Sequence, residues 1–308
     1  LGGMGSRVRP VPARDPAAAV GAASGAALMG GVLFPNVEAP DLHVMSFNIR
    51  RRFERLTWPP EDRWALRKER LRVFLGANTP HLLGSQEARP DQARWVQESL
   101  GSQYGRIGHG RGKGRDGEGT PIFYDRDRVD LLDWTQVALS DTPAIDGSVG
   151  WGNTIPRIAV IARFVDSATG APFVFVNSHF DAFSRRARRR SARWLAELVA
   201  AEELPLLFTA DVNAPIRSAE LAGMFADGGL VDTWSYAPTR RTVEWGTFND
   251  YRKPRVGARR IDAILATPDV GVRATGIDPR PTGTSWPSDH LAVQAVVRIP
   301  VPPPVAAA

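Results

Sequence analysis

Apolar and polar residues alternate in short runs along most of the chain, and this pattern predicts a strand-rich fold. The run that begins at His43 has the period of two expected of a half-buried strand, and similar runs recur as far as Ile299. Turn-forming residues such as Asp125 and Gly170 separate several of them. We therefore expect strands over residues 43–49, 81–86, 121–124, 129–139, 158–164, 173–177, 206–209, 261–266, 270–274 and 291–299.

Three segments carry apolar residues at helical spacing instead, and we expect helices over residues 64–75, 91–100 and 184–200. Residues 105–119 are rich in glycine and charge, which predicts a mobile loop. Strands outnumber helices, and the helices are interleaved irregularly. The pattern therefore fits an α+β fold of two packed sheets flanked by helices better than a doubly wound parallel sheet.

The two ends of the chain differ from this central part, for which we expect one domain over residues 41–299. Residues 1–40 combine early arginines with an uncharged, alanine- and glycine-rich stretch from Pro16 to Val37. Such a segment is either signal-like or a disordered tail, so a secreted and a cytoplasmic location both stay open. Residues 300–308 are mostly proline and alanine and predict a second disordered tail. No run approaches the roughly 20 apolar residues of a membrane-spanning helix.

Composition excludes several classes of protein. Of the 308 residues, 43% are hydrophobic and 23% are charged, which excludes disorder along the whole chain. The chain has no cysteine, so disulfide scaffolds, cysteine-ligated metals and thiol nucleophiles are excluded. The formal net charge is +6, and only three of the 39 basic residues are lysines. The arginine excess reflects either a GC-rich genome or a phosphate-bearing partner, because guanidinium groups bind phosphate oxygens through paired hydrogen bonds.

Candidate chemical groups recur where apolar runs begin or end. Strand ends and the loops after them form one rim of a sheet, so these groups could converge on a single site. A carboxylate, amide and imidazole set without cysteine suits a hard cation such as Mg²⁺ or Mn²⁺. Taken singly, each residue could equally be a turn former, a helix cap or a histidine bonded within the fold. The set comprises Asn48, Glu87, His179, Asp211, Asn213, Asp262, Asp289 and His290.

Six short motifs contain these residues, in the order MSFNIR (45–50), SQEA (85–88), VNSHFD (176–181), TADVNA (209–214), RRIDAIL (259–265) and SDH (288–290). In this order the sequence resembles the endonuclease/exonuclease/phosphatase superfamily from about His43 to Ile299. The resemblance implies a four-layer α/β/β/α sandwich with two mostly antiparallel sheets. It also implies a metal-dependent phosphoester hydrolase, which we expect to be a monomer.

The resemblance assigns metal and phosphate contacts to five residues. Glu87 is the principal ligand of Mg²⁺ or Mn²⁺, with Asn48 and Asp289 close to the metal or its waters. Arg157 is a phosphate clamp. Arg50 stands where repair nucleases place a second metal-binding carboxylate, so an arginine there suits a phosphate group instead.

The resemblance also assigns catalytic roles. His290 is the general base or an electrostatic partner of the scissile phosphate, and Asp262 orients it. Asp211 positions or activates the attacking water with help from Asn213, and His179 donates to a phosphate oxygen. These roles match the needs of the reaction, since water must be aligned and the phosphoryl oxygens neutralised.

The sequence does not decide between a nucleic acid and a small phosphorylated molecule as substrate. Arginines over residues 185–193 could line a nucleic-acid cleft or face solvent on the far side of an amphipathic helix. Two rival functions remain: a catalytically inactive scaffold that binds a phosphorylated or nucleic-acid partner, and a basic nucleic-acid-binding protein. Both leave the set of carboxylates and histidines without a role.

Overall fold

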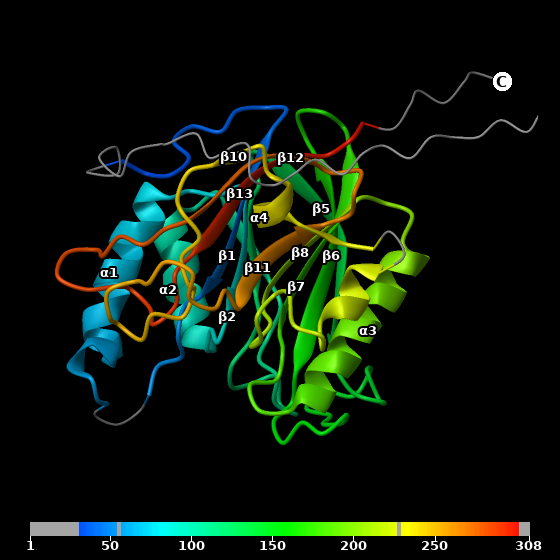
Figure 1. The fold of residues 1–308 in the computed structure, drawn as a ribbon, viewed down its shortest axis with the longest axis horizontal. Helices are drawn as coiled ribbons and strands as arrows, with labels where there is room; N and C mark the ends of the chain where they lie inside the picture. Colours follow the sequence, from blue (N-terminus) through cyan, green and yellow to red (C-terminus); the bar gives the residue numbers. More distant parts are fainter. Residues whose placement is uncertain (1–30, 54–56, 227–228, 302–308) are drawn as a thin grey trace, which may run out of the picture. The chain divides into compact units, whose positions relative to one another are not determined.

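Two β-sheets lie face to face at the centre of the fold (Figure 1). The computed structural model describes residues 31–53, 57–226 and 229–301, and all of these except Gly31 belong to a compact unit that begins at Val32. Most of the predicted signal-like segment (1–30) and of the C-terminal tail (302–308) lies outside the described residues. Leu33 and Phe34, which come before the expected domain start, are buried.

Most strand pairs within the two sheets are antiparallel, and three pairs of described strands are parallel. The seven-stranded sheet has the order β10 (Thr239–Arg240), β12 (Gly271–Ile277), β13 (Val293–Arg298), β1 (Leu42–Asn48), β2 (Leu82–Gln86), β4 (Ile122–Asp125) and β3 (Tyr104–Ile107). The six-stranded sheet has the order β5 (Val129–Ala138), β6 (Ile158–Asp166), β7 (Pro172–His179), β8 (Leu206–Asp211), β11 (Asp262–Ala266) and β9 (Val231–Asp232).

Helices cover the outer faces of the two sheets. Figure 1 shows α1 (Trp64–Ala77) and α2 (Pro90–Leu100) beside one sheet and α3 (Arg185–Ala201) beside the other. Three apolar clusters fill the spaces between these layers: one between the sheets, one under α1 and α2, and one under α3. The short helix α4 (Thr233–Tyr236) and the 3₁₀ turns η1 (Pro60–Asp62) and η2 (Ala222–Met224) lie in connections.

This arrangement confirms the predicted four-layer sandwich of mostly antiparallel sheets. The three expected helices and ten expected strands are present, with ends shifted by a few residues. The loop predicted over residues 105–119 was wrong at its start, because residues 105–107 belong to β3. In the described part of the chain, no helix is both long and apolar enough to cross a membrane.

Strand register brings the candidate residues to one rim of the two sheets. Asn48 pairs with Gln86 across the parallel β1–β2 ladder, which places Glu87 directly beyond that pair. In the second sheet, Asp211 lies between His179 on β7 and Asp262 on β11. The carboxyl ends of β1, β2, β7 and β8 therefore meet the start of β11.

Candidate active site

The site is built on strand ends at which the backbone leaves extended geometry. Arg50, Glu87 and Asn213 follow β1, β2 and β8 and have φ angles of 58°, 62° and 52°. Non-glycine residues rarely adopt this left-handed conformation, and such local strain gathers at functional sites. At each of these three positions the chain turns sharply after a strand, and each of the three residues is a candidate site residue.

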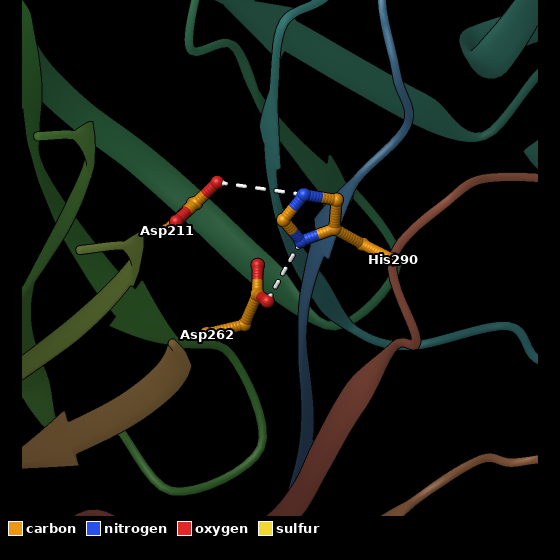
Figure 2. A group of neighbouring side chains, drawn as sticks. All are labelled: Asp211, Asp262 and His290. Atoms are coloured by element: carbon orange, nitrogen blue, oxygen red, sulfur yellow. Dashed lines mark hydrogen bonds and ion pairs between the residues drawn. The ribbon is translucent and has the colours of Figure 1, made fainter. Parts of the chain in front are cut away.

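A histidine between two aspartates forms the centre of the site. Figure 2 shows Asp211 and Asp262 directed at opposite nitrogens of the His290 ring. The His290 Nδ1 atom lies 2.8 Å from Asp262 Oδ2, and its Nε2 atom lies 3.8 Å from Asp211 Oδ2. All three side chains are buried, and their ligand atoms lie within 4.8 Å of one another. The cluster could hold a proton between its members or a metal ion.

Burial and mutual charge shift the protonation of this group. Burial alone would lower the pKa of His290, but the charges of Asp262 and Asp211 raise that pKa well above its ordinary value. Burial, followed by the charge of Asp262, raises the pKa of Asp211 to about 7. The imidazolium form of His290 is therefore favoured at neutral pH, beside a carboxyl group that titrates in the same range.

Three residues that sequence reasoning left without a role support this group. Thr247 Oγ1 accepts hydrogen bonds from the backbone N–H groups of Ile261 and Asp262 at 2.9 and 3.0 Å. Ser288 Oγ donates to the Asn48 carbonyl at 2.6 Å and accepts from the His290 backbone N–H at 3.2 Å.

The third supporting residue is Phe248, whose ring packs edge-on against the His290 ring at 5.2 Å between centroids. Its side chain is half exposed, so it lies where the site meets solvent. Of the three, Ser288 lies in the SDH motif (288–290) named above, whereas Thr247 and Phe248 belong to the stretch GTFND (246–250).

Asn48 links the aspartate group to Glu87. Its Nδ2 atom donates to Glu87 Oε1 at 3.1 Å and to Asp211 Oδ2 at 2.9 Å. The Arg50 backbone N–H donates to Asn48 Oδ1, which fixes the orientation of the amide. The Arg51 backbone N–H donates to Glu87 Oε2 at 3.0 Å. The structure thus holds the two carboxylates together through one amide.

The Glu87 carboxylate is kept ionised in a buried place. Burial opposes its charge, but His179, the Arg51 N–H, His290 and the Asn48 amide together lower the pKa of Glu87 to about 2. A carboxylate that stays charged near neutral pH is the form that binds a divalent cation. Glu87 therefore has the chemistry of a metal ligand.

His179 and Asn213 form a second pair beside Asp211. The His179 Nε2 atom lies 2.9 Å from Asn213 Nδ2 and 3.5 Å from Asp211 Oδ2. Asn213 also donates to the Phe180 carbonyl at 3.0 Å, which orients its amide. Burial, and then the charge of Arg157, lower the pKa of His179 well below its ordinary value. Burial and Arg157 therefore oppose protonation of the His179 ring, whereas the charge of Glu87 raises the pKa of that ring.

Arg50 and Asp289 pair with each other at the opposite side of the site. The Arg50 Nε atom lies 3.4 Å from Asp289 Oδ2, and its Nη2 atom lies 3.3 Å from Asp62 Oδ2. Burial raises the pKa of Asp289, although His290 and Arg50 oppose that rise. The Arg50 guanidinium is thus held by two carboxylates, and part of its side chain remains exposed.

A small cavity opens beside Glu87 and His179. The Arg157 Nε atom donates to Asp181 Oδ2 at 3.3 Å, whereas its Nη1 atom has no hydrogen-bond partner. The sequence singled out Arg157, Glu87 and His179 but gave no site role to Arg111, Glu118 and Thr120, because single residues in or next to a glycine-rich segment carry no periodicity. The polar lining residues are Glu87, Arg111, Glu118, Thr120, Arg157 and His179.

Arg67, a fully buried arginine that the sequence did not indicate, holds the loops of the rim in place. Arg67 on α1 donates its five N–H groups to backbone carbonyls, at 2.9 to 3.4 Å. The accepting residues are Ile49, Arg50, Arg51, Asp62 and Pro287. Arg67 therefore joins the loop after β1 to the loop before His290.

The basic segment 185–193 on α3 is partly neutralised within the protein. Arg185 and Arg188 both donate to Glu220, at 2.8 and 2.7 Å, and Arg188 is buried. Arg193 pairs with Glu197 one turn further along the helix. This face of α3 is therefore less positive than its sequence suggests.

A four-layer sandwich with buried Asp–His and Asn–Glu pairs at strand ends defines a class of protein, the phosphoester hydrolases. The sequence model of the endonuclease/exonuclease/phosphatase family matches residues 45–290. The chain belongs to this family, whose members hydrolyse phosphoester bonds and generally use divalent metals, and the chain is a phosphoester hydrolase. The predictions of family and of enzyme class are confirmed.

Solved structures agree with this assignment. A family protein from Bacteroides vulgatus is 30% identical, with a TM-score of 0.77 over 84% of this chain and 99% of that one. A mannosyl-6-phosphatase from Bacteroides thetaiotaomicron is 29% identical, with a TM-score of 0.76 over 83% and 99%. D. rerio TDP2 complexed with a single-strand DNA product shares the fold at 18% identity and a TM-score of 0.66, over 84% and 99%. A search among curated proteins gave no match.

Proposed function

We propose that the chain is a divalent-metal-dependent phosphoester hydrolase in which a water molecule attacks the phosphorus atom. One observation carries the proposal: Asp211 Oδ2 accepts from Asn48, which also holds Glu87, and the same oxygen lies 3.8 Å from the His290 ring that Asp262 orients. A base, an electrostatic group and a metal-binding carboxylate thus share one buried rim.

Glu87 is the principal metal ligand in this proposal. Its carboxylate is ionised, buried and at the edge of the cavity, and oxygen donors suit Mg²⁺ or Mn²⁺. Asn48 orients Glu87 through its amide nitrogen, and Asp289 adds a carboxylate next to Arg50. A bound metal would neutralise charge on a phosphoryl oxygen.

In this proposal Asp211 accepts a proton and His290 stabilises negative charge. A base is most effective when its pKa lies near the operating pH, and the pKa of Asp211 is raised to about 7. We assign Asp211 to accept the proton of the attacking water, and Asn213 donates its backbone N–H to Asp211 Oδ1 at 2.9 Å. His290, kept protonated by Asp262, offsets the charge that develops on the phosphoryl oxygens.

The remaining polar residues bind the phosphate. His179 lies at the cavity, and Arg157 has an unpaired Nη1 atom there, so both can donate to phosphoryl oxygens. Arg50 is held by Asp62 and Asp289 at the same rim, and the part of its side chain that remains exposed is the part we assign to a phosphate oxygen. The inactive-scaffold alternative gains no support from this geometry, because the proposed catalytic groups are linked to one another by hydrogen bonds and ion pairs.

The test is a hydrolysis assay on purified protein with Mg²⁺ or Mn²⁺ and p-nitrophenyl esters, with and without EDTA. We expect activity that chelation abolishes. His290→Ala should lower kcat by about 100-fold or more, the usual effect of losing one catalytic group. A folded His290→Ala variant with full activity would overturn the mechanism.

A second variant tests the metal site. Glu87→Gln should raise the metal concentration needed for half-maximal activity, because it removes the ligand's charge. Glu69→Gln, an exposed carboxylate change on α1, is the matched control and should leave the metal titration unchanged. A titration of Glu87→Gln equal to that of the wild type would remove Glu87 from the ligand set.

A further inference from the structure

The candidate site is divided between the two sheets. The proposed metal-binding residues stand at the ends of strands of the seven-stranded sheet or in the loops next to them, and these are Asn48, Glu87 and Asp289. Asp211, which we assign to accept the proton, belongs to the six-stranded sheet, as does Asp262. Hydrogen bonds cross between the sheets inside the site, from Asn48 to Asp211 at 2.9 Å and between His290 and Asp262 at 2.8 Å. The geometry of the site therefore depends on the separation of the sheets at the rim.

Asn177 lies one layer below the site, on the inner face of β7. It comes two residues before His179, and Phe173 and Phe175, which share its face, belong to the apolar cluster between the sheets. The Asn177 side chain is fully buried. Along this face the packing therefore changes from apolar to polar just before the strand reaches the rim.

Both polar atoms of the Asn177 side chain are hydrogen bonded. The Oδ1 atom accepts from Gln86 Nε2 at 2.8 Å and from Thr209 Oγ1 at 3.1 Å. The Nδ2 atom donates to three backbone carbonyls at 2.8 to 3.1 Å, those of Ser85, Thr120 and Pro121. The first of these three lies on β2 with Gln86, and the other two lead into β4. A residue of the six-stranded sheet thus holds the seven-stranded sheet through one amide.

The two residues that donate to Asn177 Oδ1 stand next to carboxylates of the site. Gln86 directly precedes Glu87 at the end of β2, and Thr209 lies two residues before Asp211 on β8. A shift of the Asn177 amide therefore reaches both carboxylates through at most two residues of backbone.

The sheets approach each other closely at this layer. A Cβ atom on Gly84 of β2 would lie 2.7 Å from Asn177 Oδ1 and would clash with Thr209 Oγ1. Apolar groups of matching shape can replace a bonded polar pair at little cost in stability, so stability alone does not require an amide here. Hydrogen bonds are directional, and a fully bonded buried network holds its members in fixed positions.

We propose that Asn177 is a positioning residue that sets the separation of the two sheets below the rim, and with it the distance between the metal site and Asp211. The proposal rests on the function proposed above and adds a residue that touches neither metal nor substrate. The proposed metal ligands all come from one sheet, whereas the proton acceptor comes from the other. Loosening the Asn177 network should therefore slow the chemical step and leave metal binding intact.

A pair of variants at Thr209 separates the hydrogen bond from packing. Thr209→Val keeps the shape of the side chain and removes the hydroxyl that donates to Asn177, whereas Thr209→Ser keeps the hydroxyl and loses a methyl group. We expect kcat to fall about tenfold in Thr209→Val, since a misplacement of about 1 Å can cost about 100-fold, and to stay within about twofold in Thr209→Ser. The metal concentration for half-maximal activity should stay within about twofold in both variants.

Gln86→Met removes the other donor to Asn177 Oδ1 with little change in side-chain size. It should behave like Thr209→Val, and it decides the question if Thr209→Val does not fold. Equal kcat values in Thr209→Val and Thr209→Ser would overturn the positioning role. So would a fall in kcat that is matched by an equal shift of the metal titration, because the two halves of the site would then not be separable.

A second measurement does not need turnover. The hydrogen bond between His290 Nδ1 and Asp262 crosses between the sheets, so the proton NMR signal of that N–H should shift in Thr209→Val and stay in place in Thr209→Ser. An unchanged signal in Thr209→Val contradicts the positioning role. A wild type that hydrolyses no ester, with the signal shifted in Thr209→Val alone, would count against the proposed function and leave the positioning role supported.

Discussion

Replacing Arg67 tests whether one buried guanidinium holds the active-site rim together. In Arg67→Lys the charge and most of the side-chain length are kept, but five N–H donors become three. The five carbonyls that Arg67 contacts lie on two loops and η1, and the arginine side chain is fully buried. At least two of these carbonyls therefore lose their donor.

The expected cost follows from that count. A buried acceptor left without a donor costs about 1–3 kcal/mol, so two of them predict a loss of at least about 2 kcal/mol in the free energy of unfolding. The site should suffer as well, because Arg51, whose carbonyl Arg67 holds, donates its N–H to Glu87. We expect a higher metal concentration for half-maximal activity in Arg67→Lys.

Urea unfolding followed by tryptophan fluorescence measures the stability change, and a metal titration of hydrolysis measures the effect on the site. Arg72→Lys, an exposed change on the same helix, is the matched control and should fall within about 0.5 kcal/mol of the wild type. If Arg67→Lys unfolds at the same urea concentration as Arg72→Lys, the five hydrogen bonds do not hold the rim.

Two further predictions concern positions away from the chemistry. Burial lowers the pKa of His43 to about 4. The unfolded chain keeps an ordinary histidine pKa and therefore binds a proton that the folded state excludes. The free energy of unfolding should therefore fall as the pH drops below about 6.5. His43 should account for a loss of about 2 kcal/mol between pH 7 and pH 5 in urea unfolding, and His43→Gln should show a shallower pH dependence; equal slopes would contradict this. In Gly84→Ala the new Cβ atom would clash with Thr209 Oγ1 and lie 2.7 Å from Asn177 Oδ1. We therefore expect a loss of about 1–3 kcal/mol in the free energy of unfolding. The control Gly76→Ala has open space around its Cβ atom and should be neutral or stabilising.

The sequence predicted those parts of the site that lie at strand ends. Asn48 and Asp211 are 163 positions apart, yet their side chains are hydrogen bonded, because each ends a strand and both strand ends reach the same rim. Asp262 and His290 could also be singled out from the sequence, because each stands in one of the motifs whose order resembles that of the superfamily. Period-two patterning locates strand ends well, and polar residues at those ends converge once the sheets pair.

The supporting residues could not be predicted in the same way. An arginine on an amphipathic helix is expected to face solvent, so nothing in the sequence separates Arg67 from its exposed neighbours on α1. Arg188 was interpreted as part of a basic face, whereas it is buried against Glu220. Thr120 follows a glycine-rich segment whose path depends on ion pairs with residues far along the chain. Such roles depend on tertiary contacts, which periodicity does not encode.

The positive charge of the chain acquires a local meaning from these contacts. Among the described residues, four carboxylates each pair with two arginines. Arg50 of one such trio also pairs with Asp289, so that group is neutral, whereas the other three trios each carry one net positive charge. Two of the trios lie at the active-site rim, one lies on α3, and one lies at the far end of β1 from the site. A binding surface for a long polyanion needs a continuous positive stripe, whereas the carboxylates of these groups neutralise part of the arginine charge within the protein. The four carboxylates are those of Asp41, Asp62, Glu118 and Glu220.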